Sequence, residues 1–291
     1  MSIWEAIVLG IVQGLTEFLP ISSTAHLLAV RSLLGHPHPE DAFTVVIQLG
    51  TLFAVFAFFR RDVWRLLGGL WQDIRSLRCA SNPDSRQGWL IVGGTIPAVL
   101  VGFLLKKQLK AWFFHLPAVA VVATLFAILM GVAEWWAMRR AAREPERTEA
   151  SIGWRVALWV GLWQACALMP GASRSGTTIT GGRLAGLDRP SAARFSFLLS
   201  LPVILAAGLK ELYDEWRKLR VAVEPGDVPS LFASSDDAVA LVVGTMVSAV
   251  VGYLAIAWLM QYLRQRSTYV FVVYRLALGA LLALALAARW L

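Results

Sequence analysis

Long apolar segments separated by short charged stretches constrain the fold of this chain more than any other feature of its sequence. A helix needs roughly 20 predominantly apolar residues to cross a bilayer. Six segments reach or approach that length: residues 43–59, 88–105, 117–138, 194–210, 238–260 and 269–290. Hydrophobic residues make up 57% of the chain, against about 45–50% in a typical soluble domain. We therefore expect an all-α polytopic membrane protein that forms one membrane domain over residues 1–291.

The net charge of +8 lies mostly in short loops between the apolar segments. Such loops follow the positive-inside rule, so the charge does not indicate a nucleic-acid partner. No Lys or Arg precedes Arg31, and Glu5 stands where a signal peptide would be positively charged. We therefore expect the first apolar segment not to be a cleaved signal. Cys79 lies in a basic loop and Cys166 in an apolar run, which argues against a disulfide.

Two short apolar segments near the start of the chain, residues 3–19 and 24–34, are joined by a polar break. Gln13 and Glu17 are four residues apart and therefore lie on one face of the first helix. Pro20 ends that helix, because its ring clashes with the preceding turn and it has no N–H to donate. Each segment is short for a membrane span, so we interpret the pair as the two half-helices of a re-entrant hairpin.

The break itself carries several polar side chains in an apolar context. Ser22, Ser23 and Thr24 are good N-cap types for the second half-helix, and His26 lies in its first turn or so. Such groups are costly within a membrane and indicate a functional site. We expect Ser22 and Thr24 to bind phosphate. The plainer alternative is a proline kink in which the hydroxyls bond back to the backbone and His26 is a core residue.

A second polar break follows residues 154–169, which Pro170 ends, and precedes a short helix over residues 177–187. Its glycines let backbone approach a ligand closely, and the helix offers free N–H groups and the positive end of its dipole. Arg174 adds a fork of donors that fits phosphate oxygens. We predict an anion site made by Ser173, Arg174, Ser175, Gly176, Thr177 and Thr178. Together with the first break it would favour a diphosphate. The alternative is a Gly/Ser-rich kink, with Arg174 extended to the surface.

The second half of the chain repeats the first. Residues 94–102 (GTIPAVLVG) resemble residues 244–252 (GTMVSAVVG) at an offset of 150. We predict a first repeat over residues 1–145 and a second over residues 146–291, each with one re-entrant hairpin and three spans. An odd number of crossings per half makes this an inverted-topology repeat, whose broken helices meet near the midplane. If every segment crosses the membrane, the repeat is parallel instead.

The distribution of charge offers a test of the inverted arrangement. On that arrangement, sixteen of the 27 Lys and Arg residues share one side, and nine lie on the other. The sixteen lie in a polar loop over residues 60–87, a loop over 139–155, the 183–194 region, Arg264 and Arg266. This bias places the basic loops in the cytoplasm and both termini outside. Arg275 lies within a membrane segment, and we expect it either to extend to the surface or to form an ion pair in the core.

Both polar breaks resemble the signatures of a known family. QGLTEFLPISSTAH (residues 13–26) and PGASRSGTT (residues 170–178) resemble the two signatures of the bacterial undecaprenyl-diphosphate phosphatases, the bacitracin-resistance family. FTVVIQLGTLFAV and FSFLLSLP also resemble family segments, so the resemblance covers nearly the whole chain. It implies an inverted-repeat enzyme of the bacterial inner membrane that removes the terminal phosphate of undecaprenyl diphosphate. It also implies a site that opens to the outer side and a supporting divalent cation, Mg²⁺ or Ca²⁺.

The resemblance carries over to individual residues. The matching positions are Glu17, Ser22, Ser23, His26, Ser173, Arg174 and Thr178. Many family members have Glu where this chain has Gln13, which can ligate a metal through its carbonyl oxygen but adds no negative charge. We therefore expect Glu17, with Gln13, to hold the cation or orient water.

For the mechanism, we expect Arg174 and the two half-helix N-termini to hold the diphosphate and His26 to transfer protons. Ser23 is either a nucleophile activated by His26 or a phosphate ligand, so covalent and direct water attack are both open. The polyprenyl tail would lie along the apolar spans among membrane lipids, and a homodimer is left open. The alternative function is a transporter or flippase of a lipid phosphate, which would need Arg174 but neither a base nor a metal.

Overall fold

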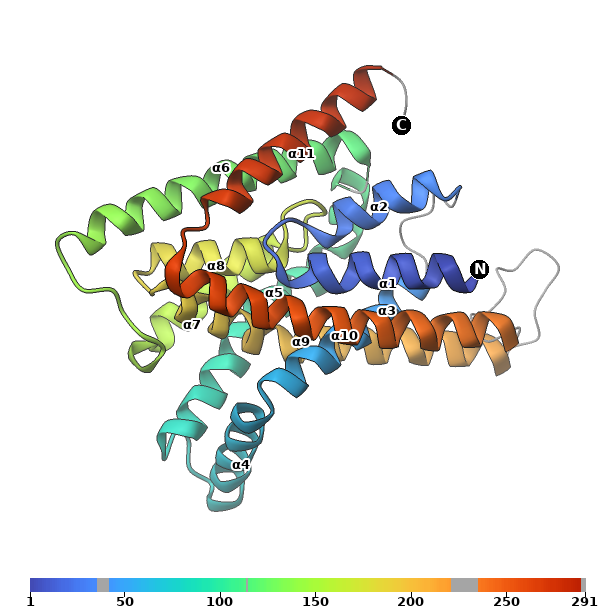
Figure 1. The fold of residues 1–291 in the computed structure, drawn as a ribbon. Helices are drawn as coiled ribbons and strands as arrows, with labels where there is room; N and C mark the ends of the chain where they lie inside the picture. The colour runs from blue at the N-terminus through green and yellow to red at the C-terminus, as the bar shows by residue number, and fades with distance from the viewer. Residues whose placement is uncertain (36–41, 114, 221–234, 289–291) are drawn as a thin grey trace.

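The computed structural model describes residues 1–35, 42–113, 115–220 and 235–288, and the regular structure in these ranges is helical (Figure 1). In chain order the elements are α1 (Ile3–Phe18), α2 (Ser23–Leu33), α3 (Ala42–Phe58), α4 (Arg60–Ser76), α5 (Pro83–Phe113), α6 (Leu116–Ala141), the 3₁₀ turn η1 (Glu149–Ser151), α7 (Trp154–Cys166), α8 (Arg174–Leu184), α9 (Arg189–Arg220), α10 (Ser235–Gln265) and α11 (Tyr269–Ala287). The all-α prediction is confirmed for these ranges.

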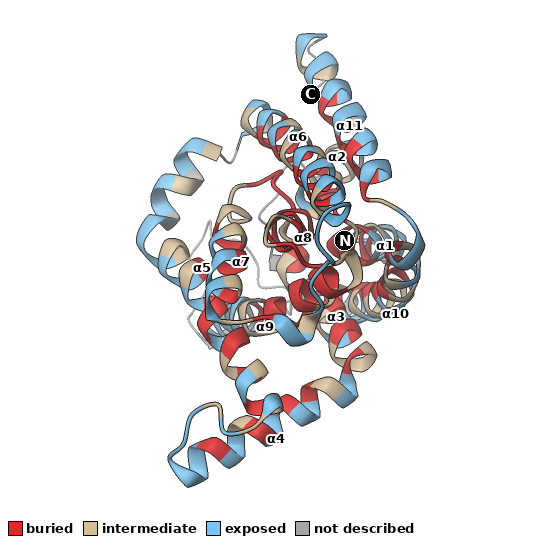
Figure 2. Ribbon diagram, turned by 90° about the vertical axis from the view of Figure 1, so that its left-hand side faces the viewer, coloured by how far each residue is buried: buried red, intermediate tan, exposed pale blue. Residues whose placement is uncertain are grey.

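Within the described ranges, five helices are long and apolar enough to cross a membrane: α5, α6, α9, α10 and α11. Helices α3 and α4 pass the same test only together, and they are bent by 84° at the residue between them. The predicted apolar segments follow these helices closely, which confirms a polytopic membrane fold, and residues 289–290 of the last segment lie outside the described residues. Buried residues gather where α1, α3, α8 and α9 meet, whereas exposed residues cover much of α4 and α11 (Figure 2).

Residues 60–87 are not a loop as predicted, because α4 occupies most of them. The helix is amphipathic: Val63 and Leu66 are buried, whereas Arg61 and Trp64 are exposed. A helix with one apolar face and one charged face is stable at the rim of a protein core. The loop prediction rested on the high charge of this segment and did not consider the 3.6-residue period of its apolar residues.

The four short helices form two hairpins. Helices α1 and α2 have 16 and 11 residues, and α7 and α8 have 13 and 11, so none reaches the roughly 20 residues of a membrane span. In Figure 1 the α1–α2 hairpin opens toward the right of the view and the α7–α8 hairpin toward the left, and their polar breaks meet in the centre. This arrangement places the two breaks against each other.

Two close helix contacts join the two halves of the chain, and in each a short helix of one half packs on a long helix of the other. Helix α1 packs on α10, where a Cβ atom at Gly10 would lie 2.6 Å from the carbonyl oxygen of Gly244. Helix α7 packs on α5, where a Cβ atom at Gly161 would collide with the carbonyl oxygen of Gly94. Only glycine allows backbones to approach this closely, so these contacts fix how the short helices seat against the long ones.

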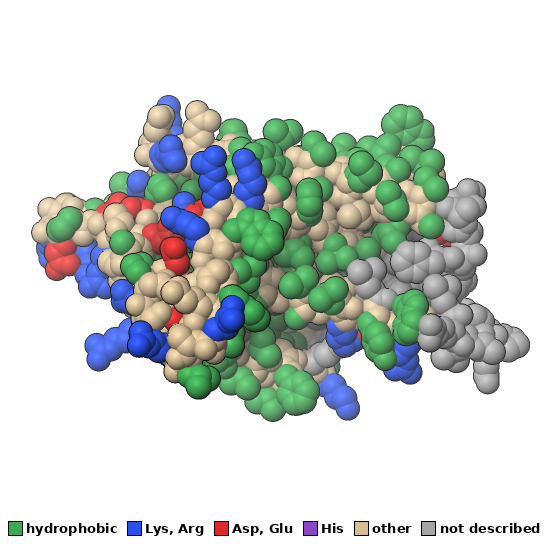
Figure 3. All heavy atoms as spheres, turned by 90° about the horizontal axis from the view of Figure 1, so that it is seen from below, with side chains coloured by type: hydrophobic (Ala, Val, Ile, Leu, Met, Phe, Trp, Pro, Cys, Tyr) green, Lys and Arg blue, Asp and Glu red, His purple; other side chains and the backbone are tan. Residues whose placement is uncertain are grey.

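The surface divides into an apolar middle and charged ends. In the view of Figure 3, hydrophobic side chains cover the middle of the face, and most of the charged side chains gather at the left-hand end. A smaller group of Lys and Arg lies toward the other end. This distribution matches a protein whose middle faces hydrocarbon and whose ends face the two polar boundaries.

Candidate active site

Each polar break turns into its following helix through a serine with an unusual backbone. Ser22 and Ser173 have φ angles of 74° and 67° and are the N-caps of α2 and α8. The Ser22 hydroxyl accepts a hydrogen bond from the backbone N of Ala25 (3.5 Å), and that of Ser173 from the backbone N of Gly176 (3.2 Å). A positive φ at a non-glycine residue costs of order 1–3 kcal/mol and typically marks a functional turn.

Glu17 lies in the last turn of α1, directly before the first break, and is only 8% exposed. One carboxylate oxygen, Oε2, accepts hydrogen bonds from Gln13 Nε2 (3.1 Å) and from Ser23 Oγ (2.9 Å). The other, Oε1, accepts from Arg174 NH2 (2.9 Å). Gln13 and Glu17 therefore lie on one face of α1, as their spacing predicts, and Glu17 contacts the second break through Arg174.

The Arg174–Glu17 ion pair joins the two hairpins. The Arg174 side chain is 13% exposed, and its NH1 atom is buried without a hydrogen-bond partner among the described residues. A second contact runs parallel to the pair, since Ser175 Oγ donates to the carbonyl oxygen of Leu19 (3.1 Å). Arg174 thus binds Glu17 through NH2, and its NH1 is free to donate to an anion.

The loop that precedes Arg174 is held by Arg275, whose role the sequence did not predict. Arg275 neither reaches the surface nor forms an ion pair with a described carboxylate, so both expectations are wrong. It is 0% exposed, and its NH2 atom donates to the carbonyl oxygens of Gly171 (3.0 Å), Ala172 (2.9 Å) and Ala123 (3.3 Å). These carbonyls pair NH2 in place of a carboxylate, whereas Nε and NH1 of Arg275 are buried without a hydrogen-bond partner among the described residues.

Several predicted phosphate ligands face elsewhere. The hydroxyls of Thr177 and Thr178 are fully buried and donate to the carbonyl oxygen of Arg174 (2.9 and 2.7 Å), and that of Thr178 also contacts Ser196. Thr24 is exposed. These hydroxyls therefore stabilise the start of α8 or face outward in this structure.

The described hydrogen bonds of His26 go to residues other than Ser23. Its Nδ1 lies 2.7 Å from the carbonyl oxygen of Ser22, and its Nε2 lies 2.6 Å from the hydroxyl of Tyr274 on α11. The two rings are stacked, with centroids 5.6 Å apart. Sequence reasoning missed Tyr274; the available signal was a Tyr-Arg pair that interrupts an otherwise apolar segment. The base that contacts Ser23 here is Glu17, not His26.

The residues around Glu17 offer few ligands for a divalent cation. Among the described residues, no group of three or more His, Cys, Asp or Glu side chains is arranged to hold a metal ion. The carbonyl oxygen of Gln13 is nevertheless buried and has no described hydrogen-bond partner. One carboxylate and one unpartnered amide oxygen fit a cation such as Mg²⁺, which typically takes one or two carboxylates and completes its shell with phosphate oxygens and water.

A large apolar cavity lies beside the core, between α3, α4, α5 and α9. Its volume is about 610 Å³, and its walls include Phe53, Leu67 and Leu198. Phe18, the residue after Glu17, packs edge-on against Phe197, the residue before the cavity-lining Leu198, with ring centroids 5.6 Å apart.

The sequence profile of the family described as Bacitracin resistance protein BacA matches residues 6–281. The chain belongs to this family. The match spans both hairpins and therefore includes every site residue from Gln13 to Arg275.

Full-length relatives agree with the family match. A protein of Prosthecochloris aestuarii (strain DSM 271 / SK 413) named undecaprenyl-diphosphatase is 46% identical over 280 residues, which are 96% of this chain and 95% of that protein. Proteins of the same name from Chloroherpeton thalassium (46% over 283 residues) and Chlorobium phaeobacteroides strain BS1 (45% over 280 residues) match 97% and 96% of this chain. They are matched over 96% and 95% of their own lengths.

Proposed function

We propose that this chain is an integral membrane phosphatase that hydrolyses undecaprenyl diphosphate to undecaprenyl phosphate and inorganic phosphate, and so recycles the lipid carrier of cell-wall synthesis. The near-full-length similarity to proteins named undecaprenyl-diphosphatase supports the substrate. The observation that carries the chemistry is the Arg174–Glu17 pair at the point where two half-helix N-termini meet. A transporter is not favoured, because a passive anion site has no need of a carboxylate beside Ser23.

The membrane arrangement belongs to the same proposal. We infer an inverted-topology repeat, with halves over residues 1–145 and 146–291, in the bacterial inner membrane. The opposite openings of the two hairpins and the repeated glycine contacts support it. The charge bias supports a cytoplasmic position for the loop after α6, with an active site that opens to the outer side.

Binding of the diphosphate uses donors from both hairpins. Arg174 NH1 is a buried donor without a described partner, and the N-terminal N–H groups of α2 and α8 add the positive ends of two helix dipoles. Donors that are fixed before the reaction stabilise the extra charge of a phosphoryl-transfer transition state without reorganisation. The polyprenyl tail would lie along the apolar spans.

Glu17 and Gln13 would hold the divalent cation through a carboxylate oxygen and the Gln13 carbonyl. When bound, such a cation neutralises charge on phosphoryl oxygens. Glu17 would at the same time orient the nucleophile. The Ser23 hydroxyl already donates to Glu17 Oε2, and an attacking water at that position would donate to the same oxygen.

Two routes fit this geometry. In the first, Ser23 Oγ attacks the terminal phosphorus and its proton passes to Glu17. The anhydride P–O bond breaks, undecaprenyl phosphate leaves, and water then hydrolyses the phosphoserine. In the second, water attacks directly and Ser23 only positions the phosphate. Ser23→Ala distinguishes them: it abolishes turnover in the first route and leaves a rate within about tenfold of the original in the second.

His26 is the remaining proton carrier of the site. Its imidazole is suited to protonate or deprotonate phosphate oxygens near neutral pH. In this structure its Nε2 contacts the hydroxyl of Tyr274, which holds the ring in place.

The test of the function is phosphate release from undecaprenyl diphosphate by the purified protein in detergent, with and without EDTA, beside an Arg174→Ala variant. Release that the variant abolishes supports the enzyme, and its loss with EDTA supports the cation. Folded protein that releases no phosphate with Mg²⁺ or Ca²⁺ would overturn the proposal, and flux into liposomes would then be measured.

A further inference from the structure

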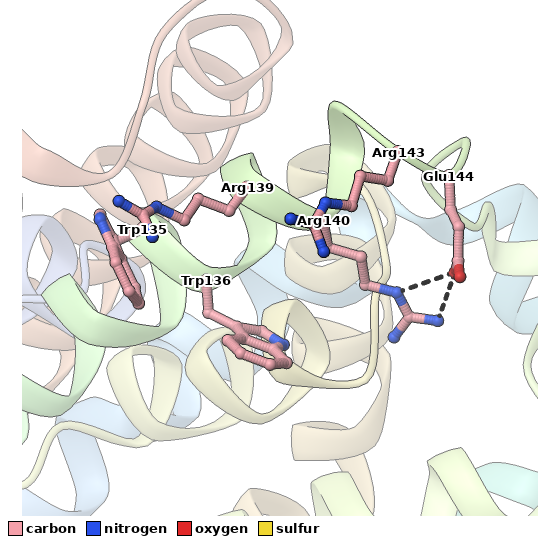
Figure 4. Close-up of a pocket in the computed structure, with 6 residues that line it drawn as sticks. All are labelled: Trp135, Trp136, Arg139, Arg140, Arg143 and Glu144. Atoms are coloured by element: carbon pink, nitrogen blue, oxygen red, sulfur yellow. Dashed lines mark hydrogen bonds and ion pairs between the residues drawn. The ribbon is translucent and has the colours of Figure 1, made fainter.

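A basic pocket lies at the C-terminal end of α6, outside the site described above. Its volume is about 340 Å³, and it is lined by Trp135, Trp136, Arg139, Arg140, Arg143 and Glu144. Figure 4 shows these side chains gathered around the last turns of α6 and the loop that follows it. The proposed catalytic chemistry uses none of them.

The pocket carries an excess of positive charge. Arg140 is bound to Glu144 through Nε (3.1 Å) and NH2 (2.9 Å). Arg139 lies over the ring of Trp135, with its guanidinium carbon 4.2 Å from the ring centroid. Neither Arg139 nor Arg143 forms an ion pair with a carboxylate in the described part of the chain. Three arginines thus face one carboxylate.

Distance separates this pocket from the diphosphate site. Helix α6 contacts the second polar break through Val119 and Ala123. Arg139 lies sixteen residues beyond Ala123 on the same helix, which is roughly 24 Å at about 1.5 Å per residue. The buried Glu134–Arg183 ion pair lies between the two regions. A ligand headgroup in one therefore does not reach the other.

General rules explain part of this composition. Arginines at a helix C-terminus complement the macrodipole, and basic residues with tryptophans collect at a membrane boundary. Neither rule requires the charges and rings to enclose a cavity or leaves two of three guanidinium groups without a carboxylate. A cavity of this size at the end of a candidate span matches one lipid headgroup, with the indoles at the depth where acyl chains begin.

We propose that this pocket binds the phosphodiester headgroup of an anionic membrane phospholipid. Arg139 and Arg143 hold the phosphate, and Trp135 and Trp136 contact the glycerol and upper acyl region. The assignment rests on charge, volume and position at the end of α6, and it is independent of the phosphatase activity.

The experiment measures lipid adducts of the full-length protein in detergent by native mass spectrometry, with phosphatidylglycerol and phosphatidylcholine titrated in parallel. We compare Arg139→Gln/Arg143→Gln with the control Arg75→Gln/Arg78→Gln, which removes the same charge from exposed arginines in and just after α4. Lipid bound at the active site is common to both variants and cancels. A basic residue near an anionic lipid contributes about fivefold in affinity, so the pair predicts about a 25-fold loss.

The proposal expects wild type and the control to prefer phosphatidylglycerol, and the pocket variant to lose that preference. Equal binding of both lipids by wild type, or equal losses in the two variants, overturns it. Displacement of the lipid by about 10 mM inorganic phosphate also overturns it, because the site would then bind free phosphate. Trp135→Leu, which keeps all charges, serves as a second variant if the double substitution unfolds, and its expected effect is a severalfold weaker adduct.

Discussion

Arg174 NH2 donates to Glu17 Oε1 across 2.9 Å, although the two residues are 157 positions apart in the chain. Each comes from a different polar break and a different hairpin. The contact joins the two hairpins into one site. The first hairpin supplies the carboxylate and the second supplies the guanidinium. Loss of either partner should therefore disable the whole site.

Arg174→Ala is expected to lower phosphate release by about 10²–10³-fold, because it removes both a preorganised phosphate donor and the partner of Glu17. Arg155→Ala, on the exposed first turn of α7, is the matched control and should leave the rate unchanged. Initial rates at saturating substrate provide the measurement. A rate within about threefold of wild type for the Arg174 variant contradicts the assignment.

Gln13→Glu is expected to lower the Mg²⁺ concentration that gives half-maximal activity. The new carboxylate would lie beside Glu17 Oε2, which now lies 3.1 Å from Gln13 Nε2, and it would add the negative charge that this site lacks. Activity is titrated with Mg²⁺ after EDTA treatment. Gln13→Leu, which has no ligand atom, should shift the titration in the opposite direction. Identical curves for all three proteins would exclude Gln13 from metal binding.

Arg275→Met is expected to destabilise the protein by about 2–4 kcal/mol, since it leaves three buried carbonyl oxygens without their donor. The loop that carries Arg174 would also lose its support, so turnover should fall more than substrate affinity. Thermal unfolding in detergent and steady-state kinetics measure the two effects. The control is Arg264→Met, at an exposed position in the last turn of α10, and a variant at Arg275 as stable as this control would refute the role.

Tyr274→Phe removes the hydroxyl that contacts His26 Nε2 and keeps the stacked ring. A neutral hydrogen bond contributes about 1 kcal/mol, so turnover should fall by about three- to tenfold with little change in KM. Tyr253→Phe, on α10, serves as the control. If His26 plays no part in proton transfer, the Tyr274 variant turns over at the wild-type rate.

Gly161→Ala is expected to destabilise the protein by about 1–3 kcal/mol, because the added Cβ would collide with the carbonyl oxygen of Gly94 and push α7 from α5. A Cβ atom added at Gly68 on α4 would have no neighbouring atom within 4 Å among the described residues, so Gly68→Ala should be neutral or slightly stabilising. Melting temperatures of the two variants give the comparison. Equal melting temperatures would show that α7 and α5 do not require this close approach.

The sequence predicted the spans well because hydropathy alone selects them. It predicted both breaks because Pro20 and Pro170 end helices and serine caps follow. It placed Glu17 and Arg174 in one site because the repeat pairs the two breaks. Their catalytic roles, the cation and the inverted membrane topology stay predictions.

What the sequence did not reveal depends on contacts between distant segments. Arg275 bonds to carbonyls of a loop about 100 residues away, and backbone oxygens carry no signature in sequence. Tyr274 contacts His26 across 248 positions. Thr177 and Thr178 look like ligands in sequence, but helix formation gives their hydroxyls a nearer acceptor in the Arg174 carbonyl.

A double-mutant cycle on phosphate release tests the central claim, that the two hairpins form one catalytic site through Glu17 and Arg174. The rates of Glu17→Ala, Arg174→Ala and the double variant are compared with wild type. When two residues act as one unit, the free-energy losses of the two single variants do not add. The rate of the double variant should therefore lie within about threefold of the rate of the slower single variant. Losses that multiply fully, or a single variant with near-normal release, would contradict the account.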